Sequence, residues 1–283
     1  MAVLVTGGSG FIGSHVVDKL KDSGFDVLVF DIAKPHRDDV KFIKGDITSQ
    51  DQLNKAMSDI EYVYHIAAAS DINKVLEQPL NAVNLNILCT ARVLDAARVN
   101  DVERVLFASS YFVDSGKGHL YATTKKASEL ICIDYHTLYG LPFTILRYGT
   151  AYGPRSRGED VISLFVKRAL SGEPLEIHGS GTQSRNFIYV EDLAKGNVAA
   201  LSDVAKNRIY ILEGRRAVTI RELAEIVTRI FDEDLDIQFG SKRPDDYSGD
   251  EASDISYKEL KWEPLVDIEE GIRRYIKWYT ENK

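Results

Sequence analysis

The chain has 283 residues, enough for one large α/β unit or for two domains with a sizeable core. Its 43 acidic and 35 basic residues give a net charge of −8, which argues against a nucleic-acid partner because phosphate binding needs clustered basic side chains. No apolar run approaches the roughly 18 residues of a membrane span, and the first residues do not resemble a signal peptide. We therefore expect a cytoplasmic protein without a membrane partner. Cys89 and Cys132 lack a CxxC or His-rich neighbourhood, so we expect buried thiols and no metal site.

Short apolar runs alternate with helix-like stretches along the first half of the chain. The predicted strands are residues 2–5, 26–30, 40–43, 62–67, 104–109 and 143–148. The predicted helices between them are residues 14–23, 50–58, 80–99 and 122–139. Buried strands that alternate with amphipathic helices predict an α/β fold with a Rossmann-type, doubly wound parallel sheet. Such a sheet binds its ligands at the carboxyl ends of the strands.

The regular alternation of strands and helices ends after Gly153-Pro154-Arg155. Beyond this point, predicted helices at 160–171, 219–231 and 267–281 are mixed with short extended segments. We expect a smaller C-terminal domain that is interleaved with the sheet. The predicted sheet domain is residues 1–155, to which 186–212 return, and the smaller domain is residues 156–185 and 213–283.

A glycine pattern between the first strand and the first helix predicts a dinucleotide site. Gly8, Gly10 and Gly13 form GxGxxG in a strand–turn–helix context, which allows a pyrophosphate to approach the helix N-terminus. Asp31 ends the second strand 18 residues after Gly13, near the distance at which a carboxylate binds the adenosine ribose. Because this carboxylate would repel the 2′-phosphate of NADP, we expect NAD, although Lys34 and Arg37 lie nearby. Asp46, after the third strand, is a candidate for the adenine amine or an ordinary turn residue.

The stretch from Ser109 to Lys125 holds the candidate reaction site. Tyr121 and Lys125 form YxxxK on a predicted helix, which puts a phenol and an ammonium on one face. A nearby cation favours phenolate, so Tyr121 could act as a base near neutral pH. The pattern alone also fits a core tyrosine beside a surface lysine. The Ser109-Ser110 pair at the end of a strand favours the catalytic interpretation, since a hydroxyl there can bind a substrate hydroxyl.

These motifs resemble those of one family along essentially the whole chain. In order they are TGGSGFIG (6–13), Asp31, GDI (45–47), HIAA (65–68), Asn86 with Thr90, Ser110, YATTK (121–125), RYGTAYGPR (147–155), RNFIYVEDLAKGN (185–197), Arg243-Pro244 and LKWEP (260–264). The chain resembles the extended short-chain dehydrogenase/reductase family, in particular its nucleotide-sugar epimerases of the UDP-glucose/UDP-galactose 4-epimerase type. The resemblance implies an NAD-binding domain, a substrate-binding domain and a catalytic triad of Ser110, Tyr121 and Lys125.

Further site residues are implied by the same resemblance. Implied NAD contacts are Gly7, Gly10, Phe11, Ile12, Gly13, Asp31, Asp46, Ile47, Ile66, Ala67, Ala68, Asn86, Tyr121, Lys125 and Tyr148. Implied substrate contacts are Ser110, Thr150, Arg185 and Arg243, of which the two arginines would clamp the diphosphate of a UDP-hexose. The predicted helices 80–98 and 122–138 carry apolar residues on more than one face: Leu80, Val83, Ile87, Leu94, Ala127, Leu130, Ile131 and Leu138. One face must cover the sheet, and the resemblance implies that the other pairs with a second subunit in a homodimer. Core packing alone also explains the pattern.

The chain departs from the family pattern around the sugar. Tyr121 follows Ser110 by only 11 residues, and Cys89 and Thr150 replace a glycine and an asparagine. Tyr111 and Phe112 stand where dehydratases and decarboxylases of the family carry acidic residues, so C4 epimerisation is the reaction that these residues favour. The alternatives are another NAD-linked nucleotide-sugar oxidoreductase or dehydratase, and a non-catalytic NAD-binding regulatory protein.

Overall fold

The computed structural model describes residues 1–114, 120–231, 235–241 and 255–282, which form two compact units. Unit 1 comprises Met1–Tyr148, Ala194–Ile211 and Ile255–Trp262. Unit 2 comprises Gly149–Leu193, Leu212–Asp254 and Glu263–Lys283. The chain passes between the units several times, so neither unit is continuous in sequence.

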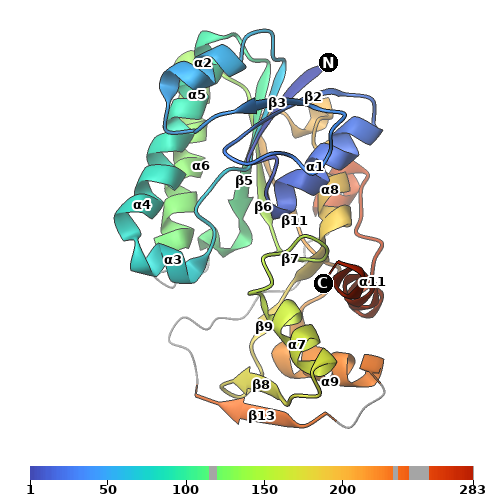
Figure 1. The fold of residues 1–283 in the computed structure, drawn as a ribbon. Coiled ribbons are helices and arrows are strands. Elements are labelled where there is room, and N and C mark those ends of the chain that lie inside the picture. Colours follow the sequence, from blue (N-terminus) through green and yellow to red (C-terminus); the bar gives the residue numbers. More distant parts are fainter. Residues whose placement is uncertain (115–119, 232–234, 242–254, 283) are drawn as a thin grey trace. The chain divides into compact units, whose positions relative to one another are not determined.

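Unit 1 is built on a seven-stranded sheet in the order β11-β6-β5-β4-β1-β2-β3 (Figure 1). The strands are β1 (Ala2–Thr6), β2 (Asp26–Asp31), β3 (Lys41–Lys44), β4 (Tyr62–His65), β5 (Arg104–Ser110), β6 (Phe143–Tyr148) and β11 (Arg208–Leu212). Six of these strands, which follow one another in the sheet as β6, β5, β4, β1, β2 and β3, pair in parallel. The predicted doubly wound fold is thus confirmed. The strand order reverses beside β1, which in such sheets marks the ligand crevice.

Helices cover both faces of this sheet, with α2 and α3–α6 on one face and α1 and α8 on the other (Figure 1). Their bounds are α1 (Phe11–Asp22), α2 (Gln50–Ala56), α3 (Ile72–Glu77), α4 (Pro79–Val83), α5 (Cys89–Val99), α6 (Leu120–Tyr139), α8 (Val190–Ala199) and α10 (Ile255–Leu260). The core between sheet and helices includes fully buried Leu4, Phe30, Val63 and Leu94. Burial of each such side chain contributes about 1.5–3 kcal/mol.

The predicted helix at 80–99 is divided in the structure. A π-helical turn, η1 (Asn84–Leu88), separates α4 from α5. Such turns are rare and frequently occur at functional sites. Here the turn contains Asn86, whose side chain is buried. The residue periodicity alone did not indicate this interruption.

Among the described residues, unit 2 contains three amphipathic helices and short strand pairs. Its helices are α7 (Val161–Leu170), α9 (Ile220–Phe231) and α11 (Ile268–Glu281). Its pairs are β7 (Thr150–Tyr152) with β10 (Phe187–Tyr189), β9 (Ser184–Arg185) with β12 (Val218–Thr219), and β8 (Leu175–His178) with β13 (Ile237–Gly240). Their apolar faces meet in a core that contains Tyr152, Phe165, Ile177 and Tyr275. Asp160 and Asp267 cap α7 and α11 by accepting backbone N–H bonds.

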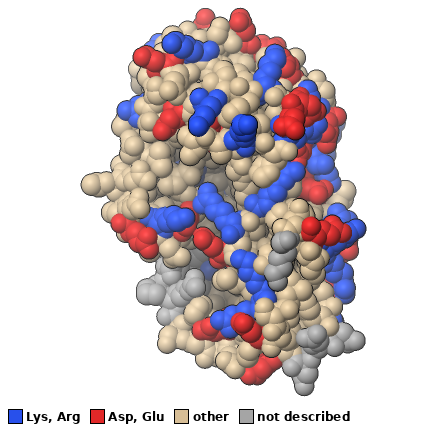
Figure 2. All heavy atoms as spheres, in the orientation of Figure 1, with Lys and Arg blue, Asp and Glu red and all other residues tan. Residues whose placement is uncertain are grey.

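The surface carries both signs of charge. On the face in Figure 2, basic and acidic side chains are intermingled, so this face has no extended basic area of the kind that binds a phosphate backbone. Among the residues described, none of the helices has the length and hydropathy to cross a membrane.

Candidate functional site

The turn from β1 to α1 is a cradle that only glycine can form. Gly7 has φ +73°, and a Cβ atom there would lie 2.6 Å from the backbone nitrogen of Ala67. A Cβ atom on Gly13 would lie 2.0 Å from the carbonyl oxygen of Gly7. Helix α1 begins after Gly10, which offers no side-chain cap, and its first turn contains no acidic residue. The N–H groups and the positive end of the helix dipole are therefore available to an anion.

Asp31 lies at the end of β2 and binds the glycine turn. Its carboxylate accepts bonds from the backbone N–H groups of Ser9 and Ala33, both at 3.0 Å. A carboxylate can accept about four hydrogen bonds, so this anchoring leaves capacity for a ribose hydroxyl. Arg37 is bound elsewhere, since its guanidinium contacts Asp22 at 2.9 Å and Asp39 at 2.8 Å. The hydrogen bonds with Asp39 and Asp22 raise the pKa of Arg37. They also mean that its positive charge is already paired with carboxylates, instead of being directed at a 2′-phosphate.

Other predicted cofactor residues also lie near the carboxyl ends of the sheet strands. Phe11, Ile12 and Gly13 open α1, Asp46 and Ile47 follow β3, Ile66, Ala67 and Ala68 follow β4, and Tyr148 ends β6. Within its turn, Asp46 accepts a bond from the N–H of Thr48 at 2.8 Å. The Tyr148 hydroxyl donates to Asn197 Oδ1 at 2.5 Å, and burial raises the pKa of Tyr148. The parallel sheet therefore gathers these residues at one edge.

Ser110, Tyr121 and Lys125 also lie in unit 1. Ser110 is the last residue of β5, and Tyr121 and Lys125 are one turn apart near the start of α6. Lys125 is buried, and its Nζ donates to the carbonyl oxygen of Ala108 at 2.8 Å and lies 4.9 Å from the Phe107 ring centre. Burial lowers the pKa of Lys125 to about 8. The ammonium is therefore held at the end of β5, two residues before Ser110.

Asn86 connects the loop after β4 to the start of α6. Its Oδ1 accepts from the N–H of Ala69 at 2.8 Å, and its Nδ2 donates to the Ala69 carbonyl at 3.0 Å and to Thr124 Oγ1 at 2.9 Å. Thr124 in turn donates to the carbonyl oxygen of Tyr121 at 2.8 Å. Through Thr124, Asn86 thus helps to hold the backbone carbonyl of Tyr121 in place.

His65, at the end of β4, continues this network toward β1. Thr90 donates its hydroxyl to the carbonyl oxygen of Asn86 at 2.6 Å, so its oxygen accepts from His65 Nε2 at 3.1 Å. The Nδ1 atom of His65 then accepts from the hydroxyl of Thr6 at 2.9 Å. Burial and the Lys125 charge lower the pKa of His65 to about 3, so the ring stays neutral. No role for His65 was predicted, because its polar partners lie on other strands and helices.

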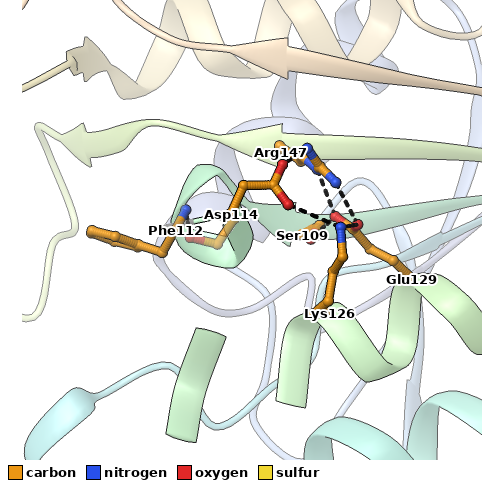
Figure 3. Close-up of polar contacts among 7 residues, drawn as sticks. Ser109, Phe112, Asp114, Lys126, Glu129 and Arg147 are labelled. Carbon is orange, nitrogen blue, oxygen red and sulfur yellow. Dashed lines mark hydrogen bonds and ion pairs between the residues drawn. The ribbon is translucent and has the colours of Figure 1, made fainter. Parts of the chain in front are cut away.

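A second polar cluster joins Ser109 to Glu129, Arg147, Asp114 and Lys126 (Figure 3). The buried carboxylate of Glu129 accepts from Ser109 Oγ at 2.6 Å and from Arg147 Nε at 2.8 Å and Nη2 at 2.7 Å. Arg147 also contacts Asp114, which pairs with Lys126 Nζ at 2.9 Å. Sequence reasoning missed this cluster. The signal was the spacing of Tyr121, Lys125 and Glu129, which are four residues apart on one helix face.

The predicted substrate residues other than Ser110 belong to unit 2 or fall outside the described residues. Thr150 begins β7, and among the residues described its buried Oγ1 has no hydrogen-bond partner. Arg185 ends β9, where one Nη atom donates to the carbonyl oxygen of Ser184 at 2.8 Å. Arg243 lies outside the described residues.

Comparison with known proteins decides the family. Residues 3–212 match the model of the NAD dependent epimerase/dehydratase family. The chain belongs to this family. It is 31% identical to a putative UDP-glucose 4-epimerase of Methanocaldococcus jannaschii, over 99% of each chain.

Solved structures of the family have the same fold over the whole chain. The UDP-glucuronic acid 4-epimerase of Bacillus cereus, in complex with UDP-glucuronic acid and NAD, superposes with a TM-score of 0.92 at 27% identity and full coverage of both chains. The UDP-N-acetylglucosamine 4-epimerase of Methanobrevibacter ruminantium, in complex with UDP-N-acetylmuramic acid, superposes with a TM-score of 0.91 at 31% identity, over 100% of this chain and 99% of that one.

The NAD-dependent epimerase/dehydratase family uses NAD, and the residues of unit 1 fit this cofactor. Gly7 and Gly13 let the turn pack more closely against Ala67 and against itself than any Cβ atom would permit, and the uncapped start of α1 suits a pyrophosphate. Asp31 suits a ribose that carries a free 2′-hydroxyl, because its charge disfavours a phosphate there. The prediction of NAD as cofactor is confirmed by the family membership and by NAD in a full-length structural neighbour.

Proposed function

We propose that the protein is an NAD-dependent epimerase that inverts C4 of a nucleotide-diphosphate hexose of the UDP-glucose/UDP-galactose type, through a transient 4-keto sugar. The observation that carries the proposal is the arrangement of Ser110 at the end of β5 with Tyr121 and buried Lys125 on α6. NAD, when bound, supplies the acceptor and donor of the C4 hydrogen.

In this proposal the chain's own residues move one proton. Tyr121 removes the proton of the C4 hydroxyl, and Ser110 holds the same oxygen by a hydrogen bond. Lys125 stabilises the phenolate of Tyr121, since its Nζ is held beside the end of β5 and its pKa of about 8 keeps it charged at neutral pH. After the 4-keto sugar has turned, Tyr121 returns the proton to the new hydroxyl.

The side chains after Ser110 favour epimerisation over elimination. Dehydration needs an acid and a base beside the sugar, whereas Tyr111 and Phe112 offer no carboxylate. Asp114 does not fill this role. Although partial burial opposes it, Lys126 and Arg147 hold the pKa of Asp114 below its usual value, so it is ionised and already paired.

We further propose that unit 1 holds NAD and that unit 2 supplies substrate contacts through Thr150, Arg185 and Arg243. The buried, unpartnered Oγ1 of Thr150, described above, supports a ligand contact at β7. Similar proteins are named for UDP-glucose, UDP-glucuronic acid and UDP-N-acetylglucosamine. A UDP-sugar is therefore the substrate class that we propose.

We propose that the protein forms a homodimer. In the structure, the apolar residues of the two helical stretches fall into a buried and an exposed group. Leu94 is buried in the core, whereas Leu80 is 85% exposed and Leu138 is 69% exposed. Leu130 and Val83 are exposed as well. A second copy of the chain would cover these side chains. Light scattering at micromolar concentration should give twice the monomer mass, and a monomer alone would contradict the proposal.

The experiment that tests the function uses purified protein without added NAD. UDP-glucose, UDP-galactose, their N-acetyl analogues and the UDP-uronic acids are incubated separately, and the products are separated by chromatography. Interconversion of one C4 pair supports the proposal, and Tyr121→Phe should retain NAD yet lose at least about 100-fold in turnover. A 4-keto-6-deoxy product would indicate a dehydratase. No turnover of any sugar, despite bound NAD, would favour a non-catalytic role.

A further inference from the structure

A short helix between Ser110 and α6 is anchored at both ends. This 3₁₀ helix, η2 (Tyr111–Asp114), directly follows β5. Near its start, the N–H of Phe112 donates to Ser110 Oγ at 3.3 Å. At its end, Asp114 pairs with Lys126 Nζ at 2.9 Å and with Arg147 (Figure 3).

The partners of Asp114 are themselves fixed. Arg147, on β6, has a side chain that is only 13% exposed, because it forms the bidentate pair with Glu129. Lys126, on α6, directly follows Lys125 and also lies 3.7 Å from Glu129. Asp114 therefore links η2 to the strand and to the helix that border Ser110.

We propose that Asp114 is a positioning residue for Ser110, an inference that rests on the function proposed above. By holding η2, its carboxylate keeps the N–H of Phe112 on Ser110 Oγ. A serine hydroxyl has two acceptor positions and one donor. Because the Phe112 N–H occupies one acceptor position, the proton and the second lone pair of Ser110 are turned toward the substrate oxygen.

The same contacts indicate that the role is not mainly structural. The side chain of Asp114 is 59% exposed, and exposed ion pairs add little to stability. If Asp114 is lost, Arg147 keeps its bidentate pair with Glu129, so the buried part of the cluster remains intact. Loss of Asp114 should therefore act on turnover and leave the fold in place.

The test is a double-mutant cycle of Asp114→Asn and Ser110→Ala in the full-length protein with its NAD. We expect Asp114→Asn to lower kcat about tenfold with unchanged NAD content and thermal midpoint, since small misplacement of a reacting group is costly. In the Ser110→Ala background the same change should alter kcat less than about twofold. An equal loss in both backgrounds, or no loss in either, would overturn the proposal.

The matched control is Asp95→Asn, which removes an exposed ion pair to Arg98 at 2.8 Å on α5 and should leave kcat unchanged. A second measurement does not depend on activity: hydrogen exchange of the Phe112 amide should be faster in Asp114→Asn than in the wild type and in the control. Unchanged exchange would overturn the proposal even if no sugar were turned over. Lack of wild-type turnover with accelerated exchange would instead count against the proposed function alone.

Discussion

The substitution Glu129→Gln tests the polar cluster beside Ser109 by a change in stability. The carboxylate of Glu129 is 2% exposed and accepts from Ser109 and twice from Arg147, at 2.6 to 2.8 Å. Glutamine is neutral and would place an NH₂ group against a guanidinium or a hydroxyl. Removing one partner of a buried ion pair costs about 3–5 kcal/mol. Because Arg147 would retain Asp114, we expect the lower end, about 3 kcal/mol.

The assay is urea unfolding followed by far-ultraviolet circular dichroism, with the free energy of unfolding taken from midpoint and slope. The control is Glu259→Gln in the same unit, where the pair to Arg208 at 2.9 Å is solvent-accessible on both sides and where a glutamine oxygen can still accept from the Tyr210 hydroxyl, which donates to Glu259 at 2.7 Å. This control should lose no more than about 1 kcal/mol. If Glu129→Gln lost as little as the control, the buried pair between Glu129 and Arg147 would not stabilise unit 1.

Three further predictions concern the cofactor and the proton chemistry. Asp31→Ala should weaken NAD binding about tenfold and NADP binding not at all, by calorimetry; unchanged selectivity would contradict the role of the carboxylate. Turnover should fall as pH rises through about 8, because Lys125, whose pKa burial lowers to about 8, loses its charge there. A pH–rate profile in which Lys125→Arg leaves this alkaline limb unmoved would be evidence against that cause. Gly13→Ala should abolish NAD binding and cost about 1–3 kcal/mol of stability, measured by thermal unfolding, because its Cβ atom would lie 2.0 Å from the Gly7 carbonyl oxygen. In Gly10→Ala the Cβ atom would lie 3.3 Å from the same oxygen, so this variant should keep the fold. Equal stability of the two variants would refute this steric explanation.

The sheet and the conformation of the glycine turn were predictable because both depend on local sequence. The predicted strand at 26–30 is β2 (Asp26–Asp31), and Asp31 ends it as expected. Buried strands are short and apolar, and the glycines stand at fixed offsets from the first of them, so pattern and structure coincide. Likewise, YxxxK needs only one helical turn to bring Tyr121 and Lys125 onto one face of α6.

Features that depend on distant partners were not predictable. The π-helical turn at Asn86 was missed, because it accompanies polar contacts with Thr124 and Ser128 on α6, about forty residues away. Short helix α3 (Ile72–Glu77) was missed because it is shorter than the window in which periodicity is visible. Hydrophobic spacing also could not separate buried Leu94 from exposed Leu80, since both lie on a stretch with two apolar faces.

The buried polar network explains how β1 and the proposed base Tyr121 are held together. Thr6, the last residue of β1, immediately precedes Gly7 of the cofactor turn, and its hydroxyl starts a chain of bonds through His65 and Thr90 to the carbonyl oxygen of Asn86. The Asn86 side chain then reaches the carbonyl of Tyr121 through Thr124. Because His65 is neutral and each hydroxyl has one proton to donate, the bonds of this chain have a single direction. A displacement of α6 against β1 would leave buried donors unpaired, which costs about 1–3 kcal/mol for each group. The network therefore opposes movement of Tyr121 relative to the glycine turn that follows β1, where we predict that the cofactor binds.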